Sequence, residues 1–233
     1  MKILTLSIMI ANELKNMIEQ ENLKEGDKLP SERELCEKLN VQRLTLRSGL
    51  RILMQEGIII SKQRSGYYVN KPRIVKNVFN LESTSEAIFE QGLNMKIKIL
   101  NIEKKETNKQ LSTKLRLPLG TKVYCLQRLR IIDDEPVSVD TSYLPIKYAQ
   151  GLEKKDFESR ALYQILESEY DISINRSEQE ILICEADNYI ANALHVELGT
   201  QMVLQQGLAY DNDNRQIEYS ESIMKMERFV YVN

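Results

Sequence analysis

Three arginines recur at four-residue steps in a stretch whose apolar residues have helical spacing. Arg43, Arg47 and Arg51 would form one row on a helix, because residues four apart share a face. An arginine side chain can donate two hydrogen bonds to a guanine edge, and lysine or arginine can also neutralise phosphates. Lys62 and Arg64 add such cations between two β-prone runs. These residues predict a DNA-contacting surface, and the alternative is a solvated charged face.

A second group of cations lies further along the chain. Arg128 and Arg130 are two residues apart in a predicted strand, so their side chains point to one face about 7 Å apart. Their partner could be Asp140 on the following strand, which would make a structural ion-pair network, or a bound carboxylate or phosphate. A hydroxyl-rich run, residues 83–85, precedes a predicted helix and suits either an anion site or simple helix caps.

Residues that would support catalysis or metal binding are scarce. The one histidine, His195, falls on the apolar stripe of a predicted helix, where we expect it to pack. Cys36, Cys125 and Cys184 are odd in number and widely spaced, which fits neither a disulfide framework nor a zinc site and indicates a reducing compartment. No nucleophile and base motif is evident. We therefore predict a protein that is not an enzyme and holds no cofactor and no metal.

Several short elements must position the first cations. Apolar residues at three- and four-residue steps in residues 6–18 predict an amphipathic helix. Ser31 followed by Glu34 is a capping box that opens a second helix, and the arginine row lies on a third. Residues 58–69 predict a hairpin with a basic tip, and Pro72 begins a linker.

The later part of the chain contains a short internal repeat, referred to as the echo. Leu-Gly-Thr at residues 119–121 recurs at residues 198–200, each time between a helical stretch and a strand, and both copies continue as strand, acidic turn and strand. Two copies are too few for a solenoid. The echo predicts a duplicated helix-hairpin unit that builds one antiparallel sheet, and therefore an α+β domain.

Net charge and hydropathy indicate which partners and which compartment the protein suits. The net charge is -2, but residues 28–73 hold ten Lys or Arg against four acids, a balance of +6 that leaves -8 elsewhere. This asymmetry favours a basic domain joined to an acidic one. The apolar start runs directly into Asn12 and Glu13 without a cleavage site, and no run approaches the roughly 20 residues that span a membrane. We expect a cytoplasmic protein.

The first domain resembles the DNA-binding domain of bacterial GntR-family regulators over residues 6–70. Residues 26–35 read Gly-Asp-Lys-Leu-Pro-Ser-Glu-Arg-Glu-Leu, residues 41–47 read Val-Gln-Arg-Leu-Thr-Leu-Arg, and residues 66–69 read Gly-Tyr-Tyr-Val. The resemblance implies a winged helix-turn-helix whose wing tip enters the minor groove. The implied DNA contacts, with the hairpin cations included, are Arg33, Arg43, Thr45, Arg47, Lys62, Arg64 and Gly66.

The second domain resembles the UTRA effector-binding domain of the HutC subfamily of GntR regulators, over about residues 80–230. The resemblance is carried by Leu-Pro-Leu-Gly at 117–120, Glu-Pro-Val at 135–137, Ser-Tyr-Leu-Pro at 142–145 and Glu-Tyr-Ser at 218–220. It implies a chorismate-lyase-like fold. The implied pocket residues are Ser83, Thr84, Ser85, Arg128, Arg130, Asp140, Tyr163 and Glu218.

Five positions depart from the family patterns. Gln42 stands where Ser is usual and Arg64 where the wing usually has a first Gly, which bears on base preference and wing conformation. Asp140 stands for the usual Glu, Ala161 for a common Ser and Met224 for a common Tyr. The missing serine weakens the case for a phosphate group on the effector without removing it.

We therefore predict an α/β protein with a winged helix-turn-helix domain at 1–71, a linker at 72–80 and an effector-binding and dimerisation domain at 81–233. A homodimer is expected because one recognition helix reads few bases and two-fold symmetry suits a palindromic operator in double-stranded DNA. The favoured function is a repressor modulated by a small anionic metabolite, preferably a sugar phosphate. The alternatives are a carboxylate effector, an activator, or an interaction module that binds no DNA.

Overall fold

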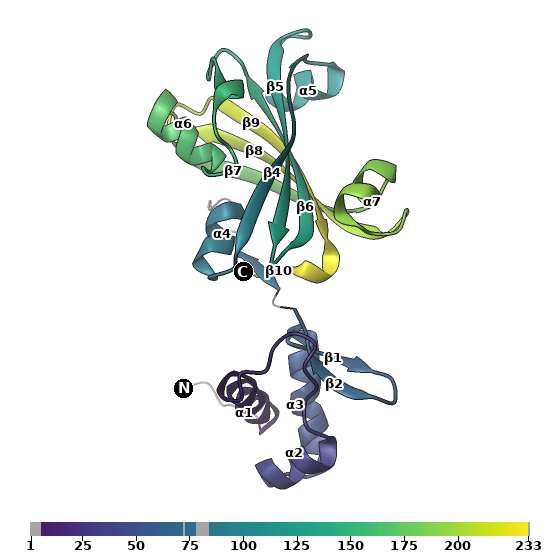
Figure 1. Ribbon diagram of the computed structural model, residues 1–233. Helices are drawn as coiled ribbons and strands as arrows, with labels where there is room; N and C mark the ends of the chain where they lie inside the picture. Colours follow the sequence, from purple (N-terminus) through teal and green to yellow (C-terminus); the bar gives the residue numbers. More distant parts are fainter. Residues whose placement is uncertain (1–5, 72, 78–83, 233) are drawn as a thin grey trace. The chain divides into compact units, whose positions relative to one another are not determined.

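The computed structural model describes residues 6–71, 73–77 and 84–232, which fall in two compact units (Figure 1). Unit 1 comprises Met1–Arg73 and unit 2 comprises Ile74–Asn233. Unit 1 consists of three helices followed by a two-stranded hairpin, as the sequence patterns predict. Its elements are α1 (Leu6–Gln20), α2 (Glu32–Leu39), α3 (Arg43–Gln55), β1 (Ile59–Lys62) and β2 (Gly66–Val69).

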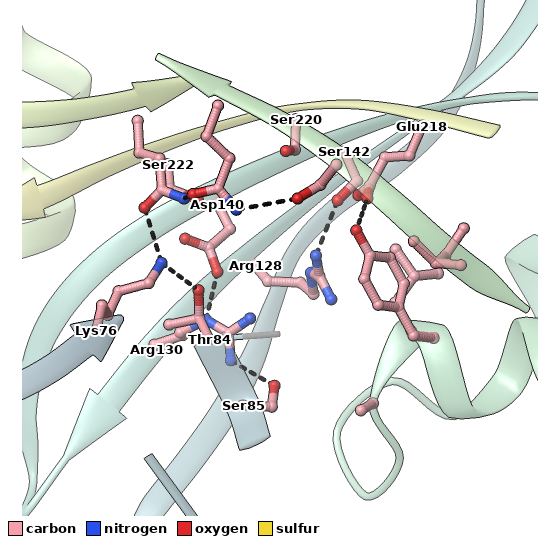
Figure 2. A pocket seen from close by; sticks show the side chains of 17 residues that line it. Lys76, Thr84, Ser85, Arg128, Arg130, Asp140, Ser142, Glu218, Ser220 and Ser222 are labelled. Atoms are coloured by element: carbon pink, nitrogen blue, oxygen red, sulfur yellow. Dashed lines mark hydrogen bonds and ion pairs between the residues drawn. The ribbon is translucent and has the colours of Figure 1, made fainter. Parts of the chain in front are cut away.

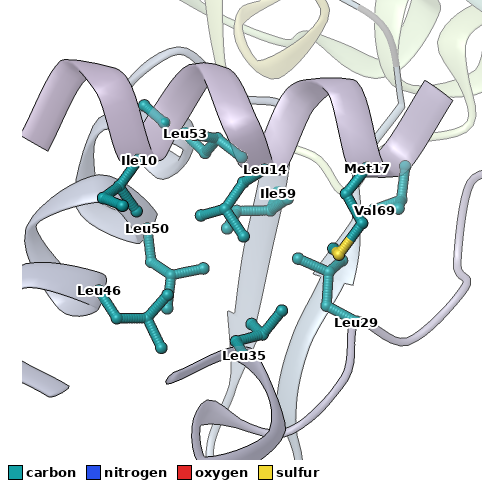
Figure 3. Close-up of a cluster of buried hydrophobic side chains, with 11 residues drawn as sticks. Ile10, Leu14, Met17, Leu29, Leu35, Leu46, Leu50, Leu53, Ile59 and Val69 are labelled. Atoms are coloured by element: carbon teal, nitrogen blue, oxygen red, sulfur yellow. The ribbon is translucent and has the colours of Figure 1, made fainter. Parts of the chain in front are cut away.

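Local signals explain where these elements begin and how they pack. The predicted capping box is present: Ser31 Oγ accepts a hydrogen bond from the Glu34 amide, and Glu34 in turn accepts one from the Ser31 amide. The apolar stripes of α1 and α3 meet in one core (Figure 3). Gly49 permits this approach, because a Cβ there would lie 2.6 Å from Ile10 Cγ2. In the hairpin, β1 pairs antiparallel with β2.

Unit 2 is built on a six-stranded antiparallel sheet in the order β4-β5-β6-β9-β8-β7. Each half has one strand, a short helix and a hairpin, so the predicted duplication is confirmed, and β6 and β9 join the halves. The first half comprises β4 (Met95–Glu106), α5 (Lys109–Leu115), β5 (Lys122–Ile132) and β6 (Glu135–Pro145). The second comprises β7 (Ile174–Glu185), α7 (Asn188–Leu194), β8 (Gln201–Asp211) and β9 (Gln216–Lys225).

The echoed residues have the same structural role in both halves. Gly120 and Gly199 adopt positive φ of 76° and 80°, which glycine reaches without strain, in the turn that leads from the short helix into the next strand. The N-caps of the two helices also correspond, since Asn108 and Asp187 each accept a hydrogen bond from the amide three residues on. The Leu-Gly-Thr signal therefore marks one turn used twice.

Further elements cover the sheet. Figure 1 shows α6 (Leu162–Tyr170) and α7 on opposite sides of it. Leu162 and Ile165 of α6 pack with Tyr124 of β5, and Leu194 of α7 packs with Leu129 of the same strand, so alternate residues of β5 serve the two faces. The remaining elements are α4 (Thr84–Glu90), β3 (Ile74–Asn77), β10 (Phe229–Val232), η1 (Leu152–Lys154) and η2 (Met226–Arg228).

Part of the segment 72–80, which we expected to be a linker, is instead a strand. β3 pairs in parallel with β10 at the other end of the chain, with Phe229 opposite Ile74. Ile74 is fully buried and packs with Phe229 and Met224. The proline at 72 suggested a linker. The strand pairing could not be inferred from the sequence, because the partner strand lies more than 150 residues away and no local pattern identifies it.

The expectation for His195 is also wrong. α7 ends at Leu194, and His195 follows as its C-cap in the left-handed conformation, with φ of 54° and an exposed side chain. The apolar spacing that suggested a continued helix reflects the turn described above, in which Leu198 is 66% exposed. His195 therefore has no packing role in the core.

Candidate functional site

The first two turns of α3 present two of the predicted arginines around one carboxylate. Arg47 donates from Nε to Glu32 Oε1 at 2.9 Å and from Nη2 to Glu32 Oε2 at 3.1 Å, and Arg43 Nε lies 3.3 Å from Glu32 Oε2. These contacts with Arg47 hold the pKa of Glu32 below its usual value. Tyr67 on β2 donates to the same carboxylate at 3.3 Å. Glu32 therefore fixes both guanidinium groups while Arg47 Nη1 stays available to an outside acceptor.

The other predicted contact residues are placed by α2, α3 and the hairpin. Arg33 on α2 is exposed beside Glu37, and Thr45 is half-buried on α3. At the hairpin tip Lys62 lies over the Tyr68 ring at 4.3 Å. Arg64 is exposed with φ of 59°, and Gly66 has φ of 116°.

Two residues of this surface were missed. Glu32 lies in the first turn of α2, and its contacts with Arg47 and Tyr67 form only when α2, α3 and the hairpin are packed together. Leu44 is 79% exposed in the first turn of α3, between Arg43 and Thr45. Its signal was in the sequence, because Leu44 falls outside the apolar stripe that α3 buries. An exposed leucine there could contact a thymine methyl group.

In unit 2 a polar pocket gathers the residues that resemblance and spacing had singled out (Figure 2). β5, β6 and β9 supply its floor, and the first turns of α4 and α6 supply part of its rim. Ser83 lies outside the described residues. The predicted residues that line the pocket are Thr84, Ser85, Arg128, Arg130, Asp140, Tyr163 and Glu218.

The two pocket arginines have different partners. Arg130 forms a buried ion pair from Nε to Asp140 and donates from Nη1 to Ser85 Oγ at 2.7 Å. Arg128 is 6% exposed and donates from Nη2 to Ser142 Oγ at 2.8 Å, while its buried Nε has no hydrogen-bond partner. Within the described ranges, no carboxylate oxygen lies within 4 Å of the Arg128 guanidinium. Asp140 thus pairs with Arg130, and the Arg128 guanidinium is left without a carboxylate partner among the described residues.

The electrostatics of the pocket agree with this division. Burial lowers the pKa of Arg128 and repulsion from Arg130 lowers it further, against attraction by Asp140 and Glu218. Burial alone would raise the pKa of Asp140, but Arg130 and Arg128 hold it below its usual range. The charged form of Arg128 is therefore poorly compensated, and an anion placed beside it would stabilise it.

Several polar groups that sequence reasoning missed complete the wall. Lys76 on β3 donates to Thr84 Oγ1 at 3.0 Å and to Gln205 Oε1 at 2.7 Å. Gln205 on β8 donates to Gln179 on β7 at 2.7 Å. Beside these missed groups, the predicted pair is in contact: Glu218 accepts a hydrogen bond from the Tyr163 hydroxyl at 2.7 Å. These donors and acceptors suit a ligand rich in hydroxyl groups.

The described part of the chain contains no group of three or more His, Cys, Asp or Glu side chains that could hold a metal ion. None of its helices combines the length and the apolar character that a membrane span requires.

Comparison with known proteins decides the family. The family model described as bacterial regulatory proteins of the gntR family matches residues 6–69, and the UTRA domain model matches residues 90–230. The chain belongs to the GntR family. Its members with a UTRA domain form the HutC-like group, so the family, the winged helix-turn-helix and the α+β effector domain expected from the sequence are confirmed. The family consists of transcriptional regulators, which confirms that the chain is not an enzyme.

This GntR-family regulator is similar to proteins of known fold and function along nearly its whole length. It is 25% identical to the HTH-type transcriptional repressor NagR of Bacillus subtilis, over 96% of this chain and 92% of the relative. It is 26% identical to the mannosyl-D-glycerate transport/metabolism system repressor MngR of Escherichia coli, over 95% and 92%. The crystal structure of PhnF from Mycobacterium smegmatis matches with a TM-score of 0.82 at 27% identity, over 96% of this chain and 97% of that one.

Proposed function

We propose that this regulator is a homodimeric repressor whose operator binding is modulated by a small anionic metabolite held in the unit 2 pocket. The observation that carries the proposal is the buried Arg128, which lacks a carboxylate partner among the described residues. A buried cation without such a partner is costly, so a ligand anion beside it would be favoured. The names of NagR and MngR, both repressors, support the sign of regulation.

A sugar phosphate is the effector that this pocket suits best, and a carboxylated sugar is the alternative. The anion would lie between Arg128 and the first turn of α6, where Leu162 and Tyr163 line the pocket and helix amides favour negative charge. Glu218 would accept hydrogen bonds from hydroxyl groups of the same ligand, and Gln179 would donate hydrogen bonds to them. Ala161 offers no hydroxyl to a phosphate, so the phosphate would depend on Arg128 and backbone amides.

The DNA-binding surface would consist of the first two turns of α3 and the hairpin tip. Arg47, held by Glu32, would donate from its remaining edge to a base or phosphate, and Lys62 and Arg64 would neutralise phosphates. Leu44 would contribute an apolar contact.

The experiment for this function is a fluorescence anisotropy titration of the DNA upstream of the protein's own gene, against a scrambled duplex. A regulator with several phosphate contacts is expected to prefer the upstream DNA, and the logarithm of its affinity should fall steeply with the logarithm of salt concentration. Absence of binding at every salt concentration would favour the interaction module instead.

β7 is the edge of the sheet that we propose as the dimer contact. It lies at the end of the strand order, and Ile181, Leu182 and Ile183 on it are 41%, 40% and 67% exposed. A long edge strand with an exposed apolar run invites pairing with another chain, and the same strand from a second copy would satisfy both edges by two-fold symmetry.

Replacing Ile183 with Glu is expected to shift the protein from dimer to monomer, because the dimer would bury that carboxylate at its contact. Native mass spectrometry measures the change. The matched control is Leu198→Glu, since Leu198 is similarly exposed at 66% but lies in the turn before β8 and not on β7. A dimer that survives Ile183→Glu, or is lost equally in both variants, argues against this edge.

A further inference from the structure

A second hollow adjoins the pocket that we assign to the effector. Its volume is about 420 Å³, and it lies between α4, the start of β4 and residues 158–164 that lead into α6. Ser85 and Ala161 line both hollows. The two spaces are therefore neighbours that share part of one wall, and a single ligand could occupy both.

The wall of this second hollow is largely apolar on the side formed by α4 and β4, and its other side carries Glu158, Ser159, Arg160 and Gln164. Met95 and Ile97 are two residues apart on β4, so both side chains point to the same face. Phe89 on α4 completes this wall although 83% of its surface is exposed. A phenylalanine that lines a hollow and is left uncovered favours an apolar occupant, because covering the ring removes apolar surface from water.

Two contacts define the border between the hollows. Met95 Sδ accepts a hydrogen bond at 3.3 Å from Nη1 of Arg130, whose Nε is paired with Asp140, so the apolar wall begins where the charged cluster ends. Ala161, the N-cap of α6, makes no side-chain capping hydrogen bond. The Ala161 side chain at this border is smaller and less polar than a serine side chain would be.

We propose that the effector is amphipathic, with an anionic, hydroxyl-bearing head beside Arg128 and an apolar substituent, aryl or short alkyl, in the hollow formed by Phe89, Met95 and Ile97. This inference rests on the proposed effector pocket. A substituent attached to the head would extend past Ala161 and cover the Phe89 ring. The ligand class is thus an acidic sugar joined to an apolar group, and a simple sugar acid or sugar phosphate would fill only the charged half.

The test compares ligands that differ only in the apolar group. Isothermal titration calorimetry is carried out on the full-length protein with glucose 6-phosphate against phenyl β-glucoside 6-phosphate, and with glucuronate against phenyl β-glucuronide. The phenyl member of at least one pair is expected to bind about 10-fold more tightly or better, because its ring leaves water. Phe89→Ala should reduce this preference severalfold and leave the affinity for the parent sugar unchanged. The control Tyr189→Ala removes a 47% exposed aromatic ring on α7 and should preserve the preference.

Three results would overturn the proposal. Equal affinity for the two members of every pair that binds would refute the apolar subsite while leaving the effector pocket intact. Failure of all four compounds to bind at millimolar concentration would refute the subsite and the anionic sugar pocket together. If Phe89→Ala changed the oligomeric state in light scattering and left the phenyl preference untouched, Phe89 would belong to a contact between copies of the chain.

Discussion

Replacing Arg128 with Met is expected to abolish effector binding and to leave the ligand-free protein at least as stable as the wild type. The buried Arg128 guanidinium has no carboxylate partner within 4 Å among the described residues. Removing its charge relieves a desolvation cost and the repulsion from Arg130, and gives up the hydrogen bond to Ser142 and the weaker attraction to Asp140 and Glu218. Thermal unfolding with and without ligand measures both effects. The operator affinity of the variant should match the wild type and no longer respond to ligand.

The matched control is Arg130→Met, two residues along the same strand. Arg130 is ion-paired with Asp140, and both side chains are about 5% exposed. Breaking such a pair leaves a buried carboxylate uncompensated, which costs about 3–5 kcal/mol. Arg130→Met should therefore unfold at a clearly lower temperature than Arg128→Met. If both variants lost the same stability, Arg128 would be a structural residue and the effector pocket would lose its main support.

Replacing Arg47 with Ala is expected to weaken specific operator binding by about 1–3 kcal/mol, which is roughly 5- to 150-fold, without changing effector affinity. Arg47 is fixed by two hydrogen bonds to Glu32, so little of its freedom remains to be lost on DNA. Anisotropy titration with operator and scrambled DNA measures the specific part, and calorimetry measures the effector.

Arg51→Ala is the control for this variant, because Arg51 is also exposed and lies one turn further along α3. It should weaken binding to both DNAs slightly and equally. If Arg47→Ala affected the two DNAs equally, Arg47 would contribute charge alone and the specificity would lie elsewhere. Loss of effector binding in Arg47→Ala would mean that the variant is misfolded.

Much of the fold could be predicted because its signals are local. The capping box at Ser31, the apolar stripes of α1 and α3 and the repeated glycine turns each depend on residues a few positions apart. The parallel pair of β3 and β10 could not be predicted, since neither strand carries a pattern that names its partner. Lys76, on β3, was missed as a pocket residue for the same reason.

The division of roles between the pocket arginines also lay beyond the sequence. Spacing placed Arg128 and Arg130 on one face, and Asp140 was correctly named as an internal partner. The strand register sets Arg128 directly opposite Asp140, yet the side chain that pairs with Asp140 belongs to Arg130. The direction that each long side chain takes within the packed pocket decides which arginine pairs with Asp140, and neither residue spacing nor strand register specifies that direction.

The central claim is that one chain couples an anion site in unit 2 to DNA binding by unit 1, and such a coupling must be reciprocal. The most direct measurement is the operator titration repeated with a panel of hexose phosphates and their phenyl glycosides, followed by titration of the responding compound with and without operator. At least one compound is expected to lower operator affinity, and operator is expected to lower the affinity for that compound by the same factor. An operator affinity that no bound compound changes would rule out this coupling.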